Sequence, residues 1–115
     1  MTRGVRHYPA SALRLEKDET GSRYWSISLK NSMLSYFEVP PGARFAEHAH
    51  ESEQITYVLD GVLIFRIDGR EYRVAERSAI AIPANVPHEV RALDGPVRAV
   101  DAWSPPRDLG VAAPD

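Results

Sequence analysis

Short apolar-rich stretches separated by turn-forming residues are the main pattern along this chain. Aromatic and β-branched residues dominate these stretches, and residues 24–29 alternate them with serines. Such alternation is typical of strands, whose successive side chains point to opposite faces. The pattern predicts strands at residues 24–29, 33–39, 54–59, 62–67, 72–74, 78–82, 88–92 and 97–103. No segment keeps a helical period over three turns, so we expect an all-β chain with no helix longer than about two turns.

Turn residues lie at the boundaries of these stretches. The Asp-Gly pairs at 60–61 and 68–69 predict tight hairpins, because glycine tolerates the positive φ that such turns need, and a third pair at 94–95 separates the last two strands. Prolines bracket strands and interrupt none of them. Strands at this spacing predict an antiparallel β-sandwich or β-barrel.

The length of 115 residues fits one domain. We expect residues 23–108 to form the barrel, residues 1–22 to form an N-terminal arm or edge strand, and residues 109–115 to form a loose C-terminal tail. Hydrophobic residues make up 43% of the chain, which is enough for a core. A core this small gains from a bound metal or a partner subunit.

The amino-acid composition argues against several classes of function. The formal net charge is −2 and the chain has no run of Lys or Arg, which argues against nucleic-acid or membrane-surface partners. The chain has no cysteine, so disulfides, thiolate catalysis and zinc-thiolate sites are excluded. The N-terminus lacks the apolar segment of a signal peptide, and no apolar run approaches the ~20 residues of a membrane span. We therefore expect a cytoplasmic protein.

Histidines carry the most informative chemistry. His48 and His50 are two residues apart, and side chains at that spacing in a strand share one face. Gln54 begins the next predicted strand and His88 begins a later one, so the four side chains can converge across the lumen of a barrel. A histidine pair at this spacing is by itself weak support for a metal.

Other polar residues nearby have simpler interpretations. His7 is expected to be an ordinary surface histidine, and Glu47, Glu51 and Glu53 are more often solvated loop charges than ligands. The order of the whole set, rather than any one residue, indicates a metal site.

That order resembles the cupin family. The stretch Gly42-x5-His48-x-His50-x3-Gln54-x6-Gly61 is similar to the first cupin motif, G-x5-H-x-H-x3–4-E-x6-G. The stretch from Ile80 to His88 resembles the second motif, which is built around P-x-G-x2-H. Asn85 replaces the motif's glycine but also tolerates a left-handed backbone. The other departures are Arg77, at the motif's leading glycine, and Ala92, at its closing asparagine.

The resemblance implies a cupin jelly roll with one divalent metal ion on His48, His50, Gln54 and His88. Glu53 competes with Gln54 for the fourth position, and we favour Gln54 because a Glu-Gln pair occurs here in one subgroup of cupins. Three imidazoles and an amide leave the ion's charge uncompensated and make it a stronger Lewis acid. Nitrogen and oxygen ligands suit Zn, Ni, Fe, Mn or Co, and ligand type does not choose among them.

The last strand adds two residues to the predicted site. The run Asp101-Ala-Trp-Ser-Pro-Pro-Arg107 resembles the D-x-[FW]-x-P-P-R signature of cupins of the pectin-degradation type, which open the ring of unsaturated uronates. The resemblance implies that Asp101 and Arg107 line the metal site as catalytic residues. Asp101 shares its strand face with apolar residues, so it either points into the barrel or lies at its rim.

The sequence is compatible with three functions. The first is a small-molecule enzyme, an isomerase, lyase or ring-opening or cyclising enzyme of a sugar-acid-like or polyketide-like carbonyl compound. The second is an Fe(II)-dependent dioxygenase, and the third is a non-catalytic ligand-binding or sensing cupin. A carboxylate-bearing substrate would suit Arg107. We also expect a homodimer, because a small barrel has apolar edges to cover.

Overall fold

The computed structural model describes residues 3–108, and these form two antiparallel sheets. The six-stranded sheet has the order β1-β2-β3-β10-β5-β8, and the four-stranded sheet has the order β4-β9-β6-β7. The strands are β1 Glu16–Lys17, β2 Arg23–Ser28, β3 Met33–Val39, β4 Arg44–His48, β5 Glu53–Asp60, β6 Leu63–Ile67, β7 Arg70–Val74, β8 Ala79–Ile82, β9 His88–Ala92 and β10 Val97–Ser104. The only helix in this part of the chain is the 3₁₀ turn Ala10–Ala12. The all-β prediction is confirmed.

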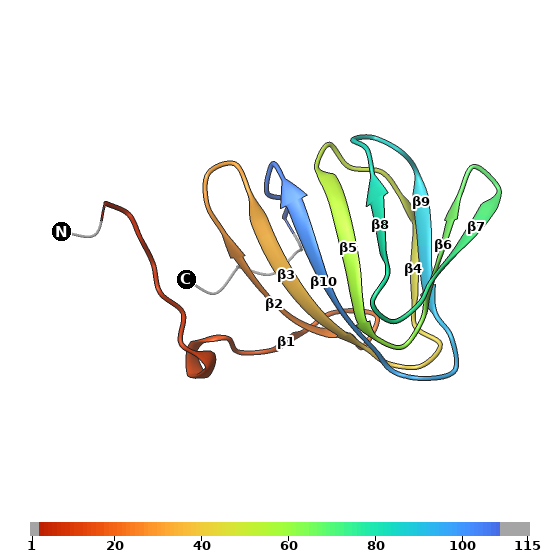
Figure 1. Cartoon of the computed structure of the whole chain (residues 1–115), viewed down its shortest axis with the longest axis horizontal. Helices are drawn as coiled ribbons and strands as arrows, with labels where there is room; N and C mark the ends of the chain where they lie inside the picture. Colours follow the sequence, from red (N-terminus) through yellow and green to blue (C-terminus); the bar gives the residue numbers. More distant parts are fainter. Residues whose placement is uncertain (1–2, 109–115) are drawn as a thin grey trace.

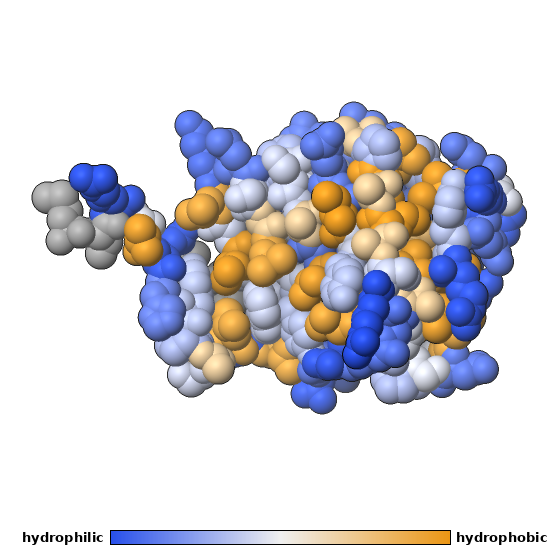
Figure 2. Space-filling view, viewed as in Figure 1, coloured by the Kyte–Doolittle hydropathy of each residue, from blue (hydrophilic) through white to orange (hydrophobic). Residues whose placement is uncertain are grey.

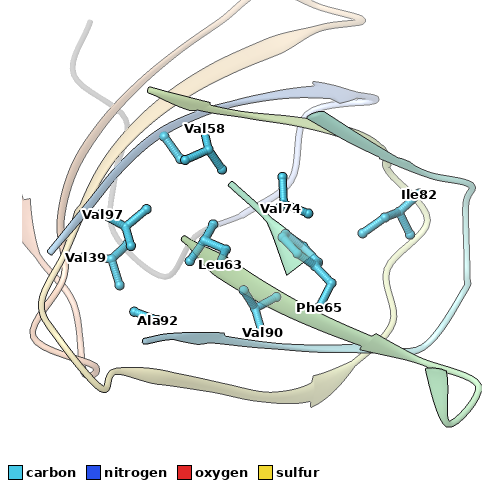
Figure 3. Packing of buried hydrophobic residues seen from close by; sticks show 10 residues of the cluster. Val39, Val58, Leu63, Phe65, Val74, Ile82, Val90, Ala92 and Val97 are labelled. Atoms are coloured by element: carbon cyan, nitrogen blue, oxygen red, sulfur yellow. The ribbon is translucent and has the colours of Figure 1, made fainter. Parts of the chain in front are cut away.

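The core lies between the two sheets, because each strand turns alternate residues inward. On β10 the burial alternates along the strand, with Val97, Ala99, Asp101 and Trp103 buried and the residues between them more exposed. Side chains from both sheets meet inside the barrel, including Val39 and Val58 from one sheet and Leu63 and Phe65 from the other (Figure 3). Of the two orientations that the sequence left open for Asp101, the structure shows the inward one.

Two of the predicted turns have different outcomes. Asp68 and Gly69 form the expected hairpin between β6 and β7, and both have positive φ. The prediction of a hairpin at Asp60-Gly61 is wrong, because β5 belongs to the six-stranded sheet and β6 to the four-stranded sheet. Gly61 is needed here for close approach, since a Cβ would collide with the carbonyl oxygen of Pro96. The pair at 94–95 likewise joins strands of different sheets.

The apolar pattern did not predict β4, and it gave no bounds for β1, which lies within residues 1–22, the range expected to form an arm or edge strand. β1 has only two residues and pairs with β2, as the first strand of the six-stranded sheet. The chain before it runs away from the barrel (Figure 1). β4 has little apolar alternation and contains an irregularity between Phe45 and His48 in its pairing with β9. The expected tail, residues 109–115, lies outside the described residues. No helix of residues 3–108 has the length and apolar character needed to cross a membrane.

Candidate metal centre

Three histidines meet at one end of the barrel. His48 is the last residue of β4 and lies directly opposite His88, the first residue of β9. His50 follows two residues after His48, in the loop beyond β4. The ring centroids are 4.4 Å apart for His48 and His88, 5.0 Å for His50 and His88, and 5.4 Å for His48 and His50. One possible ligand atom from each ring lies within 4.8 Å of the others.

The way in which these rings converge differs from the sequence prediction. His50 is not on the strand that ends at His48, so the rule that alternate strand residues share a face does not explain the pair. His48 and His88 are neighbours within one sheet and do not face each other across the lumen. The loop that carries His50 is held by Asn85, whose backbone N–H donates to the His50 carbonyl at 2.8 Å. Asn85 has the left-handed backbone, with φ of 64°, that was expected at this position of the motif.

Backbone carbonyl groups orient all three rings. The Nδ1 atom of His48 lies 2.9 Å from the Ala46 carbonyl, that of His50 lies 2.8 Å from the Ser52 carbonyl, and that of His88 lies 2.8 Å from the Val86 carbonyl. A carbonyl accepts only, so each Nδ1 carries the proton and donates it. Each Nε2 is then left with its lone pair, which is the arrangement found in metal-binding histidines.

The histidines suit a cation better than a proton. Burial lowers the pKa of His50 and of His88, because a charged imidazolium loses hydration inside the barrel. The Nε2 atom of His88 is buried and has no hydrogen-bond partner. A buried unsatisfied polar atom is costly, and a metal ion bound at Nε2 removes that cost. The residues present therefore fit a metal ion.

Gln54 lies next to these histidines, on the inner face of β5. Its side chain is buried, with Oε1 3.1 Å from Nε2 of His50, whereas Glu53 is exposed. The Gln54 amide donates from Nε2 to Thr56 Oγ1 at 2.9 Å, which leaves Oε1 turned toward His50. Both facing atoms carry lone pairs, and a cation between them would satisfy both. This contact is a second feature that fits a metal ion.

Asp101 lies one step further along the sheet, on β10. It pairs with Thr56 of β5 and is only 8% exposed. The Thr56 hydroxyl donates to Asp101 Oδ1. Burial raises the pKa of Asp101 to about 7, although the Thr56 hydrogen bond and the Arg107 charge act in the opposite direction. Asp101 thus points inward and has a pKa close to neutrality.

Arg107 follows β10 and turns back over the site. Its guanidinium carbon lies 5.1 Å from the centroid of the Trp103 ring, and that ring lies 5.4 Å from the ring of His50. The preceding backbone is held by Ser52, whose hydroxyl donates to the Pro105 carbonyl at 2.6 Å. Sequence reasoning missed Ser52 and Thr56. The period-two pattern could have revealed Thr56, which shares a strand face with Gln54.

A cavity of about 680 Å³ connects these groups. His48, Gln54, His88, Asp101 and Arg107 line one part of it. The remaining wall is largely apolar and includes Phe37 and Phe65. Of the six residues predicted for the site, only His50 is absent from the lining, although its ring lies against those of His48, His88 and Trp103. The arrangement can hold a cation beside a carboxyl group that exchanges protons near neutral pH.

Comparison with known proteins agrees with this fold and motif order. The family model described as Cupin domain matches residues 35–103, which include all four predicted ligands and Asp101. This chain is a member of the cupin family. A relative among curated proteins is the tetracenomycin polyketide synthase protein TcmJ of Streptomyces glaucescens, 28% identical over 82 residues. That match covers 70% of this cupin and 55% of TcmJ, so the cupin spans about half of its relative.

Solved structures show the same fold. KdgF from a Halomonas species superposes with a TM-score of 0.82 at 23% identity, covering 93% of this cupin and 99% of KdgF. The polyketide cyclase RemF from Streptomyces resistomycificus superposes with a TM-score of 0.75 at 21% identity, covering 96% of this cupin and 89% of RemF. At such identities the likeness establishes the jelly-roll fold alone.

Proposed function

We propose that this cupin binds one divalent metal ion through His48, His50, Gln54 and His88 and acts as an enzyme on a small carbonyl compound. The observation that carries the proposal is the group of three imidazole rings in the same cavity region as the buried carboxyl group of Asp101. Each ring keeps a lone pair on Nε2, because its Nδ1 donates to a backbone carbonyl. Glu53 is not part of the proposed site, because its side chain is exposed.

A divalent ion at this position supplies Lewis acidity toward a carbonyl or hydroxyl oxygen. Asp101 transfers a proton to or from the substrate, and its pKa of about 7 allows both protonation states near neutral pH. Thr56 holds the carboxyl group in place through its hydrogen bond to Oδ1. Arg107 orients an anionic group of the substrate, and the Trp103 ring fixes the position of the guanidinium.

The reaction class that fits these groups is isomerisation, a lyase step, or ring opening or cyclisation. Each of these moves a proton next to a carbonyl group, which is what a Lewis acid and a neutral-range carboxyl group promote together. The names of TcmJ, a polyketide synthase protein, and RemF, a polyketide cyclase, support a carbonyl-rich substrate for this cupin as well.

Substitution of Asp101 and Arg107 separates their roles. Asp101→Asn keeps the shape of the side chain but exchanges no proton near neutral pH, so turnover should fall about 10²–10⁴-fold with metal content unchanged. Arg107→Lys should chiefly raise the KM of an acidic substrate, because an ammonium lacks the two-pronged geometry of guanidinium. The assay is turnover of uronates and of aromatic hydroxy-carbonyl compounds by metal-loaded protein, with Asp94→Asn, an exposed turn residue, as the matched control.

An active Asp101→Asn variant that has lost its metal would contradict this assignment and make Asp101 a support of the metal site. Oxygen consumption by iron-loaded protein, without isomerase or lyase activity, would place the chain among the dioxygenases instead.

We also propose that the chain forms a homodimer through the outer face of the six-stranded sheet. Two cross-strand rows on this face are apolar: Leu34, Ala102, Ile55 and Ala81 form one, and Tyr36, Val100, Tyr57 and Ala79 form the other. Leu34, Ile55 and Tyr57 are 39%, 55% and 38% exposed. Apolar residues gather over the area of β10, β5 and β8 in this view (Figure 2). A second copy of the same face would bury these rows symmetrically.

Sedimentation velocity at micromolar concentration tests the dimer. Ile55→Glu places a charge in the middle of the face and should convert a dimer to a monomer without unfolding the barrel. Leu29→Glu is the matched control, since Leu29 is 62% exposed in the turn after β2 and lies outside both rows. A monomeric wild-type protein, or a dimer that Ile55→Glu leaves intact, would contradict the proposal.

A further inference from the structure

Tyr24, a residue of the cavity wall, has an unpaired hydroxyl group. Its residue on β2 pairs with Phe37 on β3, and the two rings stack with centroids 5.4 Å apart. The residue is 1% exposed and lines the same cavity as His48 and His88. Its hydroxyl oxygen is buried and has no hydrogen-bond partner. The ring is therefore held by packing, while its one polar atom is left unsatisfied.

A buried hydroxyl without a partner costs folding free energy, because it has given up its hydrogen bonds to water. Tyr24 resembles His88 in this respect, since both carry a buried, unpartnered polar atom and both line the cavity. Burial raises the pKa of Tyr24, and the nearby charges of Glu16, Asp18 and Asp108 raise it further. The group is thus an O–H donor at neutral pH. A ligand that pairs with it must offer an acceptor oxygen.

The register of the sheet separates Tyr24 from the metal end. Phe37, the partner of Tyr24, lies opposite Ala99 of β10, and Ala99 is two residues from Asp101. At about 3.4 Å per residue, the Tyr24 row lies about 7 Å from the Asp101 row along the strand. A ligand that reaches from Asp101 to Tyr24 must therefore be longer than one carbonyl group with its neighbours.

The cavity wall on the Tyr24 side has a large apolar part. This part consists of Phe37, Val39, Leu63, Phe65, Val90 and Ala99, and Thr20 and Arg44 also line the cavity. A sugar acid carries a hydroxyl on nearly every carbon and would bury those that face the apolar part without partners. A flat unsaturated ring would instead lose apolar surface to the wall and present few oxygens. The acidic residues Asp18, Glu19 and Asp108 also line the cavity and disfavour an anionic group near Tyr24.

We propose that the Tyr24 hydroxyl donates a hydrogen bond to a neutral oxygen on the distal ring of the substrate, and that the substrate is an aromatic or polycyclic hydroxy-carbonyl compound rather than a sugar acid. This inference rests on the proposed function for the metal end of the cavity. It makes Tyr24 a substrate-binding residue, with Phe37 holding its ring in position.

Two naphthalene probes test the contact. 3-Hydroxy-2-naphthoate carries its oxygens at one end, and 3,7-dihydroxy-2-naphthoate adds one hydroxyl on the far ring. Calorimetric titration of Zn²⁺-loaded protein should show that the wild type prefers the dihydroxy probe about 3- to 10-fold, as expected for one neutral hydrogen bond. Tyr24→Phe should lose that preference while binding the monohydroxy probe as before, because the stacked ring is retained.

Tyr72→Phe is the matched control, since Tyr72 lies on β7 away from this cavity and should keep the preference. Thermal unfolding of Tyr24→Phe without ligand should occur at the wild-type temperature or above it, because an unpaired hydroxyl has been removed.

Equal binding of both probes to the wild type, or an unchanged preference in Tyr24→Phe, would overturn the Tyr24 contact. Binding of galacturonate in preference to both naphthoates would overturn the substrate class. Neither result concerns the proposed metal site, which is judged separately from Zn²⁺ titration of the same protein without probe.

Discussion

The two ends of the barrel interior are built by the same strands but carry opposite chemistry. On β5 the inward residues are Gln54 and Thr56 toward the histidines, and then Val58 toward the other end. On β10 they are Trp103 and Asp101, and then Ala99 and Val97.

The apolar end packs side chains from both sheets into the core that stabilises the fold, and several of these side chains also form the cavity wall. The histidine end buries polar groups such as His88 Nε2 and the Asp101 carboxyl, which cost stability in the absence of a ligand. The contrast shows that residues two positions apart on one strand can serve stability and chemistry separately.

Shortening a core side chain should lower the stability of the fold without removing the metal. Leu63 is 4% exposed within the core cluster, and Leu63→Ala should lower the free energy of unfolding by about 3 kcal/mol through lost burial and a residual cavity. Urea unfolding measures this, with the exposed turn residue Leu29→Ala as a control that should change stability by less than about 0.5 kcal/mol. Metal loss from folded Leu63→Ala protein would show that the two ends are not independent.

Removing the buried carboxyl group should raise the free energy of unfolding of the metal-free protein above neutral pH, whereas Leu63→Ala lowers it. The pKa of Asp101 is raised to about 7 in the folded chain, so its protonated form stabilises the fold below the unfolded pKa and this contribution is lost as pH rises through about 7. Asp101→Asn does not titrate. Between pH 5 and pH 8, metal-free wild type should lose about 2–3 kcal/mol relative to Asp101→Asn. Urea unfolding after dialysis against EDTA measures the difference, and equal pH profiles would show that Asp101 is ionised in the folded state.

Sequence patterns predicted the strands well where the apolar alternation is strong, as in residues 33–39 and 97–103. They failed for β4, whose exposed and irregular residues carry little hydrophobic signal. The Asp60-Gly61 turn was wrong for a different reason. A glycine can be required by close approach to another strand rather than by a hairpin, and local sequence does not distinguish these two needs.

The candidate site followed from motif order more than from local geometry. The prediction named His48, His50 and His88, but their convergence depends on the pairing of β4 with β9 and on the His50 loop, which no strand period encodes. The strand pattern of residues 97–103 placed Asp101 on an apolar face but left open whether it points into the barrel or lies at the rim, and the burial pattern of β10 shows the inward orientation. The unpaired Tyr24 hydroxyl could not be inferred from the sequence, because the lack of a partner depends on every surrounding side chain.

The most direct test of the central claim is the metal content of the intact protein. The protein is loaded with Zn²⁺ and dialysed against a weak chelator. Its zinc content per chain is then measured by elemental mass spectrometry. Wild type should retain about one ion per chain, and His50→Ala and His88→Ala should each lose nearly all of it, since three remaining ligands hold the ion poorly. His7→Ala, an exposed histidine outside the site, should retain the wild-type content. Full metal content in His50→Ala after the same dialysis would contradict the account.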